Sequence, residues 1–94
     1  MPSMKAQNED VVLHLIQGWW WAAAGETPQP LMAAEIARRM VNLMITLPDK
    51  SLYLLAIEQL TPEVVGIVRD LHRRGLIQAS DDDVAVFRYL GPDA

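Results

Sequence analysis

The clearest pattern along the chain is an apolar stripe with helical spacing in residues 62–74. Apolar residues recur there at positions i, i+3, i+4 and i+7, namely Val64, Ile67, Val68 and Leu71. Thr61 is a favoured N-cap residue, and Pro62 fits the first helical position, where its missing N–H costs nothing. Gly75 supplies the left-handed residue that ends many helices. The pattern predicts a helix over residues 62–74.

Two short runs of strand-forming residues follow this helix. They occupy residues 76–78 and 84–90, and a polar turn at residues 79–83 separates them. The spacing predicts a two-stranded β-hairpin that begins directly after the helix.

The first half of the chain shows helical patterns separated by glycine and proline. Asn8 suits the N-cap of a helix over residues 8–24, which Gly25 ends. The prolines in residues 26–30 predict a loop. A second helix is predicted over residues 31–46, where the polar residues form one narrow stripe.

The third predicted helix, residues 51–60, is apolar nearly all round, which is typical of a buried helix. We therefore expect a central element that is packed on both sides. This helix meets the helix over residues 62–74 at Leu60-Thr61, a connection short enough for a helix-turn-helix. In such a unit the first of the two is the positioning helix and the second is the recognition helix.

The helix end and the hairpin resemble the last helix and wing of winged-helix domains. The resemblance covers about a third of the chain and is carried by Leu71, Arg73, Arg74, Gly75, Leu76, Ile77, Val84, Val86, Phe87 and Tyr89. Residues 32–40 are also similar to the first helix of helix-turn-helix units. The implied fold is winged-helix-like and mainly α with a C-terminal β-hairpin, with about four helices followed by a two-stranded wing. We expect one such domain over residues 8–90, a disordered N-terminus at residues 1–7 and a tail at residues 91–94.

The resemblance implies DNA binding, because the corresponding helix is the DNA-recognition helix in most winged-helix families. The candidate DNA-binding residues are Arg69, His72, Arg73, Arg74 and Arg88. Arg69 and Arg73 are one helical turn apart, so they can reach a base edge and a phosphate respectively. The leading hypothesis is a small, dimeric transcriptional regulator that binds double-stranded DNA.

Charge favours a second hypothesis, a winged-helix adaptor that binds protein and not DNA. The net charge of the chain is −4, and residues 62–80 carry three arginines against Glu63 and Asp70, a net charge of +1. This is a thin footprint for phosphate contacts. The turn residues 81–83 are all aspartate and would repel DNA. An adaptor would use the acidic turn and the tryptophan and methionine surfaces as contact sites, and a structural subunit of a larger assembly is a third hypothesis.

Three consecutive tryptophans stand near the end of the first predicted helix. At about 100° per residue, Trp19, Trp20 and Trp21 fan across roughly 200° of a helix, so one core-facing stripe cannot hold all three. Either two are core and one is an exposed edge residue, or they form an interface, where tryptophan is enriched. The hydrophobic fraction of 51% is high for 94 residues and points to self-association. We predict a homodimer, with the tryptophans as its dimer or partner interface.

Gly66 lies in the middle of a predicted helix, where glycine costs about 1 kcal/mol relative to alanine. It could permit a close approach to a DNA backbone. It could also let a neighbouring helix of the same chain pack closely, which is the explanation that we favour.

Candidate chemistry is sparse. The chain has no cysteine, which excludes disulfides, thiolate zinc sites and cysteine nucleophiles. His14 and His72 belong to separate predicted helices, and no nucleophile motif or glycine-rich phosphate loop is present. We expect no enzymatic activity, no cofactor and no metal. The apolar run at residues 11–24 is too short to span a bilayer and follows two acidic residues, so we expect a cytoplasmic protein that contacts no membrane.

Overall fold

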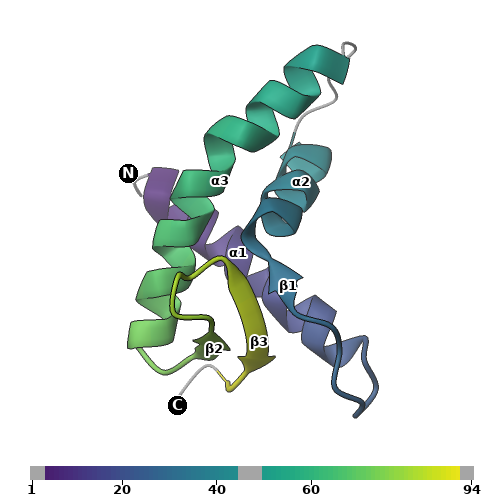
Figure 1. Ribbon diagram of the computed structural model, residues 1–94, viewed down its shortest axis with the longest axis vertical. Helices are drawn as coiled ribbons and strands as arrows, with labels where there is room; N and C mark the ends of the chain where they lie inside the picture. Colours follow the sequence, from purple (N-terminus) through teal and green to yellow (C-terminus); the bar gives the residue numbers. More distant parts are fainter. Residues whose placement is uncertain (1–3, 45–49, 92–94) are drawn as a thin grey trace.

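The computed structural model describes residues 4–44 and 50–91, and over these residues the protein is mainly helical with a small three-stranded antiparallel sheet (Figure 1). In chain order the elements are α1 (Met4–Trp21), β1 (Leu31–Met32), α2 (Ala33–Met44), α3 (Lys50–Arg73), β2 (Ile77–Ala79) and β3 (Ala85–Tyr89). The prediction of a mainly α fold with a C-terminal β-hairpin is confirmed at this level. The finer prediction of four helices and two strands is wrong, because the described residues form three of each.

The sheet contains one strand more than the hairpin. Its order is β1-β3-β2, so β3 lies in the middle and pairs with both neighbours. Leu31 lies opposite Val86 in one pair, and Ile77 lies opposite Tyr89 in the other. β1 has only two residues, too few for an alternating pattern, and we had assigned them to the second helix. Long-range pairing with β3 makes them a strand.

The predicted end of the last helix is confirmed. Gly75 adopts a φ of 78°, the left-handed conformation that glycine reaches without strain. The N–H of Leu76 then donates to the carbonyl oxygen of Leu71 at 3.1 Å, and the N–H of Gly75 donates to His72 at 3.1 Å. These bonds satisfy carbonyls at the helix end and send the chain directly into the hairpin.

A single helix replaces the two that the sequence predicted over residues 51–60 and 62–74. α3 runs through Thr61 and Pro62 without a break, and the Thr61 hydroxyl donates to the carbonyl of Ile57, 2.7 Å away. Thr61 is therefore not an N-cap, and the helix-turn-helix at Leu60-Thr61 is wrong. Pro62 removes only one hydrogen bond of the helix, and α3 bends partway along its length, as proline-containing helices do (Figure 1).

α1 begins at Met4, before the predicted start at Asn8. Asn8 is not an N-cap: its side chain is buried, and its Nδ2 donates to Oε1 of Glu63 in α3 at 3.0 Å. A distant partner thus satisfies the amide. At the other end, α1 stops at Trp21, before the predicted end at Ala24, and a turn with positive φ at Ala24 and Gly25 follows it. Parts of the predicted disordered N-terminus and tail, residues 1–3 and 92–94, lie outside the described residues.

The hydrophobic core lies where α1, α2, the second half of α3 and the sheet meet. Its largest fully buried side chains are Val12, Ile16, Ile36, Met40, Val64, Ile67, Val68, Leu71, Ile77 and Val86. α2 packs along α3, and α1 crosses behind both (Figure 1). The apolar stripe of residues 64–71 is buried as its spacing predicted.

The first half of α3, residues 50–61, projects beyond the sheet and beyond α1, and of the described elements only α2 lies beside it (Figure 1). We call this segment the arm. Its side chains of Leu52, Leu54 and Leu55 are 49%, 53% and 47% exposed, and Leu43 at the end of α2 is 70% exposed. The prediction of a central helix packed on both sides is therefore wrong.

Of the described helices, α3 alone is long and apolar enough to cross a membrane by length and composition. Core helices of soluble proteins pass the same test, and the second half of α3 contributes four buried residues to this core. The length and hydropathy of α3 are therefore weak evidence that it spans a membrane.

Candidate functional site

The arginines of the predicted DNA-binding face are paired with carboxylates. Nε of Arg69 donates to Oδ2 of Asp83 at 3.0 Å, and Nδ1 of His72 lies 3.8 Å from the other oxygen of the same carboxylate. Asp83 is buried and adopts a positive φ of 60° at the end of the hairpin turn. The turn therefore docks on α3 through its last aspartate, and it places negative charge on the face that was predicted to meet DNA.

The other two arginines of α3's C-terminal end are also paired. Arg73 lies 3.5 Å from Asp70 in the same helix, and Arg74 forms an ion pair with Glu9 of α1. The side chains of Arg69, Arg73 and Arg74 remain 57%, 70% and 56% exposed. Ion pairs this exposed contribute little to stability, but they lower the positive potential of the face.

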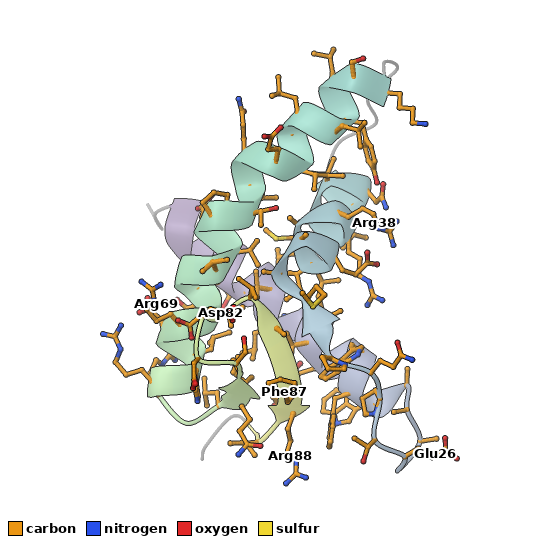
Figure 2. The ribbon with its side chains drawn as sticks, viewed as in Figure 1. Glu26, Arg38, Arg69, Asp82, Phe87 and Arg88 are labelled. Atoms are coloured by element: carbon orange, nitrogen blue, oxygen red, sulfur yellow. The ribbon has the colours of Figure 1, made fainter. Side chains whose placement is uncertain are left out.

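Arg88 does not join this cluster. It lies on β3, at the opposite end of the sheet from the Arg69 side chain (Figure 2). The structure therefore brings Arg69, His72 and Arg73 together on one face, with Arg74 at its edge, and leaves Arg88 elsewhere.

The acidic turn is held by its own hydrogen bonds. The Ser80 hydroxyl donates to Oδ1 of Asp82 at 2.5 Å, and the N–H of Val84 donates to the same oxygen at 3.3 Å. These two donors lower the pKa of Asp82 below its ordinary value. Within the described part of the chain, no three His, Asp or Glu side chains gather in a way that could hold a metal ion.

The three tryptophans have different environments. Trp19 and Trp20 are partly buried against the core, and the Trp19 indole donates to the carbonyl of Gln29 at 3.2 Å. Trp21 is 64% exposed and meets Tyr89 edge-on, with ring centroids 5.9 Å apart. This agrees with the alternative of two core-packed residues and one edge residue.

Trp20, Trp21 and Arg88 share a shallow hollow of about 310 Å³ that the loop after α1 completes. The remaining lining residues are Gly25, Glu26 and Thr27. We call it the tryptophan hollow. It lies at the far end of the protein from the arm (Figure 2).

Gly66 is in open space. A Cβ placed on it would meet nothing within 4 Å, so no other element of the described chain packs against it. It lies in a second open hollow that includes Glu63, Arg69 and Arg73. Packing within the chain, which we had weighed as the reason for this glycine, is therefore wrong for the described residues.

The exposure of the arm was not predicted from the sequence. Its one signal was the helix that is apolar nearly all round, which we interpreted as burial. α2 covers one side of the arm, and on α2 the Arg38 guanidinium is hydrogen-bonded to Glu35. The bonds from Arg38, and a further one from Arg39, lower the pKa of Glu35 from 4.5 to about 2.

Comparisons of the chain with protein-family models, with curated proteins and with solved structures found no match.

Proposed function

We propose that this protein is a non-enzymatic protein-interaction module on a winged-helix-like scaffold. The hairpin that directly follows α3 supports the winged-helix resemblance. The packing of α2 on α3 also supports the winged-helix resemblance. In this proposal α2 is the positioning helix and α3 is the recognition helix, in place of the pair predicted at residues 51–60 and 62–74.

The observation that carries the choice of protein over DNA is the pairing of each arginine at the C-terminal end of α3 with a carboxylate. DNA affinity depends on releasing counterions from phosphates, and each basic residue that already faces a carboxylate contributes less to it. In the part of the chain that the structure describes, the pairs Arg69–Asp83, Arg73–Asp70 and Arg74–Glu9 place an acid beside each of these arginines.

The tryptophan hollow is the contact site that we assign to a protein partner. It combines exposed indole surface with the Arg88 guanidinium. Tryptophan and arginine are the side chains that most often carry the binding energy of an interface. A partner segment with an aromatic or aliphatic anchor next to a carboxylate fits these groups.

A titration of labelled mixed-sequence duplex DNA, followed by fluorescence anisotropy at low and moderate salt, tests the choice. We expect no salt-sensitive binding at micromolar protein. Micromolar binding that weakens steeply with salt would overturn the proposal.

A partner is sought by quantitative affinity enrichment with tagged wild-type protein, Trp21→Ala and the control Leu52→Ala. The control lies on the arm, away from the hollow. We expect a protein that the wild type and the control retain and that Trp21→Ala loses. Equal retention by all three would remove the hollow as the contact site.

DNA binding stays as a second candidate because of Gly66. Its open surface beside Arg69 and Arg73 would let a phosphate backbone approach α3 closely. Exposed ion pairs are weak enough for phosphates to replace the carboxylates. In this case Arg69→Ala and Arg73→Ala weaken DNA binding in the anisotropy titration and leave the circular dichroism spectrum unchanged.

A further inference from the structure

One side of the arm is exposed over its whole length. Lys50, Ser51, Leu54, Leu55 and Glu58 follow the spacing i, i+1, i+4, i+5 and i+8, so they lie within an arc of about 140° on the helix. All five side chains are exposed. We call this set the arm face.

The arm face points away from the protein's own core. Tyr53, Ile57 and Leu60 lie on the other side of the arm, where they are partly buried, and α2 packs along α3. No described element covers Leu54 or Leu55, each close to half exposed. Exposed leucines that neighbour one another mark an interaction surface more often than they mark a solvent face.

We propose that the arm face binds a second copy of this chain, with the two arms antiparallel and a two-fold axis passing near Leu54. This self-association uses a surface other than the tryptophan hollow and holds for either candidate function. It also moves the predicted dimer contact from the tryptophans to α3.

The charges of Lys50 and Glu58 favour a second copy of the chain as the partner of the arm face and favour an antiparallel orientation of the two arms. Lys50 and Glu58 are the only charged residues between residues 50 and 62, and neither forms an ion pair within residues 4–44 and 50–91. They lie on either side of Leu54, about 12 Å apart along the helix axis at 1.5 Å per residue. A two-fold axis at Leu54 places Lys50 of each copy against Glu58 of the other. Parallel arms would oppose like charges instead.

The spacing also suits helix packing. Lys50, Leu54 and Glu58 form a ridge with a spacing of four residues, and Ser51 and Leu55 form the next ridge. Two identical helices interdigitate such ridges in the commonest class of helix packing. Leu54 of one copy then lies beside Leu54 and Leu55 of the other.

The area of the arm face sets the expected strength. The face is one helix wide and about two and a half turns long, so its area is below the roughly 800 Å² per partner of a standard stable interface. We therefore expect a weak, reversible dimer with a Kd on the order of 10 to 100 μM, as is usual for small interfaces.

Sedimentation velocity over a concentration series measures this dimer. Leu54→Ser should weaken association by about tenfold, because a symmetric interface loses the same leucine from both copies. Leu52→Ser is the matched control: Leu52 is 49% exposed but lies about 160° around the helix from Leu54, so its association should equal that of wild type. Circular dichroism checks that each variant is folded.

A charge exchange tests the direction of the arms. Lys50→Glu and Glu58→Lys each place like charges together twice in an antiparallel dimer, so each should weaken association. The double variant Lys50→Glu/Glu58→Lys exchanges the charges and should restore the wild-type affinity. The antiparallel dimer is supported if the double variant regains the wild-type affinity and the control Leu52→Ser associates as strongly as wild type.

Three results would overturn the proposal. The first is a monomer at every concentration up to the millimolar range. The second is equal weakening by Leu54→Ser and Leu52→Ser, which would indicate non-specific association of apolar surface. The third is binding to phosphatidylcholine vesicles that Leu54→Ser abolishes in a protein that stays monomeric, which would assign the arm face to a lipid surface.

Discussion

Both halves of α3 carry many apolar residues, but only the second half buries them in the core. In residues 62–73 the apolar residues keep a helical spacing and fill the core, with Arg69, Asp70 and Arg73 on the other side. In residues 50–61 they surround the helix, and the leucines outside the contact with α2 remain about half exposed. A helix that is apolar all round is therefore buried only if the chain supplies elements to surround it. Among the described elements, α1 and the sheet pack against the second half of α3, whereas only α2 packs against the first half.

Truncating a leucine in each half should give the largest contrast. Leu71 is fully buried, so Leu71→Ala should lower the free energy of unfolding by about 2–5 kcal/mol. Leu52→Ala should change it by no more than about 0.5 kcal/mol, because Leu52 is half exposed and fills no cavity. Urea denaturation followed by circular dichroism measures both. A loss of similar size in the two variants would contradict the division of α3 into a core half and an exposed half.

The junction between the halves should respond to the removal of its proline. Pro62→Ala supplies an N–H for the Glu58 carbonyl. A proline inside a helix costs roughly 3 kcal/mol, but it also lowers the conformational entropy of the unfolded chain, which offsets part of this cost. We therefore expect the free energy of unfolding to rise by about 1 kcal/mol. Thermal unfolding gives the change. A lower midpoint would mean that the bend itself is needed for packing.

Gly66, in the core half of α3, offers a test of whether an exposed position there is kept for stability or for binding. Gly66→Ala should stabilise the protein by about 0.5–1 kcal/mol, because the helix gains a better former and the new Cβ meets nothing within 4 Å. Chemical denaturation measures it. If the variant is more stable but loses a binding activity that wild type shows, close approach at Gly66 is part of that activity.

The smallest expected effect concerns the ion pairs of Glu35 with Arg38 and Arg39 within α2, the helix beside the arm. The folded-state pKa of Glu35 is lowered from 4.5 to about 2, so its contribution to stability is complete above the unfolded-state pKa and is lost as the pH falls from about 4.5 towards 2. Its carboxylate is partly exposed, so solvent screening limits the effect to about 0.5–1 kcal/mol. Thermal midpoints of wild type and Glu35→Gln should therefore differ at pH 6 and converge near pH 2. A constant difference across this range would exclude the charge of Glu35 as its cause.

Local patterns predicted those features whose cause lies within a few residues. The stripe at residues 64–71, the glycine end at Gly75 and the turn of the hairpin depend on spacing and turn chemistry. β1 could not be predicted in this way, because two residues become a strand only through pairing with β3. Asn8 and Thr61 had the chemistry of N-caps, but a partner 55 residues away holds Asn8, and the Ile57 carbonyl four residues back accepts from Thr61.

The candidate sites show the same limit. The sequence placed Arg69, His72 and Arg73 on one helix face, and the structure brings them together there. The charges that neutralise this face come from elsewhere: Asp83 lies 14 residues after Arg69, and Glu9 lies 65 residues before Arg74. Such distant pairings carry no local signal. The exposure of the arm depends in the same way on which elements reach it.

Pro62 weakens the main-chain hydrogen-bond ladder between the arm and the second half of α3. Without an N–H at this position, no main-chain hydrogen bond joins Pro62 to the turn before it, and unwinding that starts at the arm meets a gap in the ladder there. Amide protons of residues 52–60 should then exchange with solvent far faster than those of residues 64–71, which open only with the whole core. Such a difference in exchange would show that the arm unwinds and re-forms while the rest of the domain stays folded.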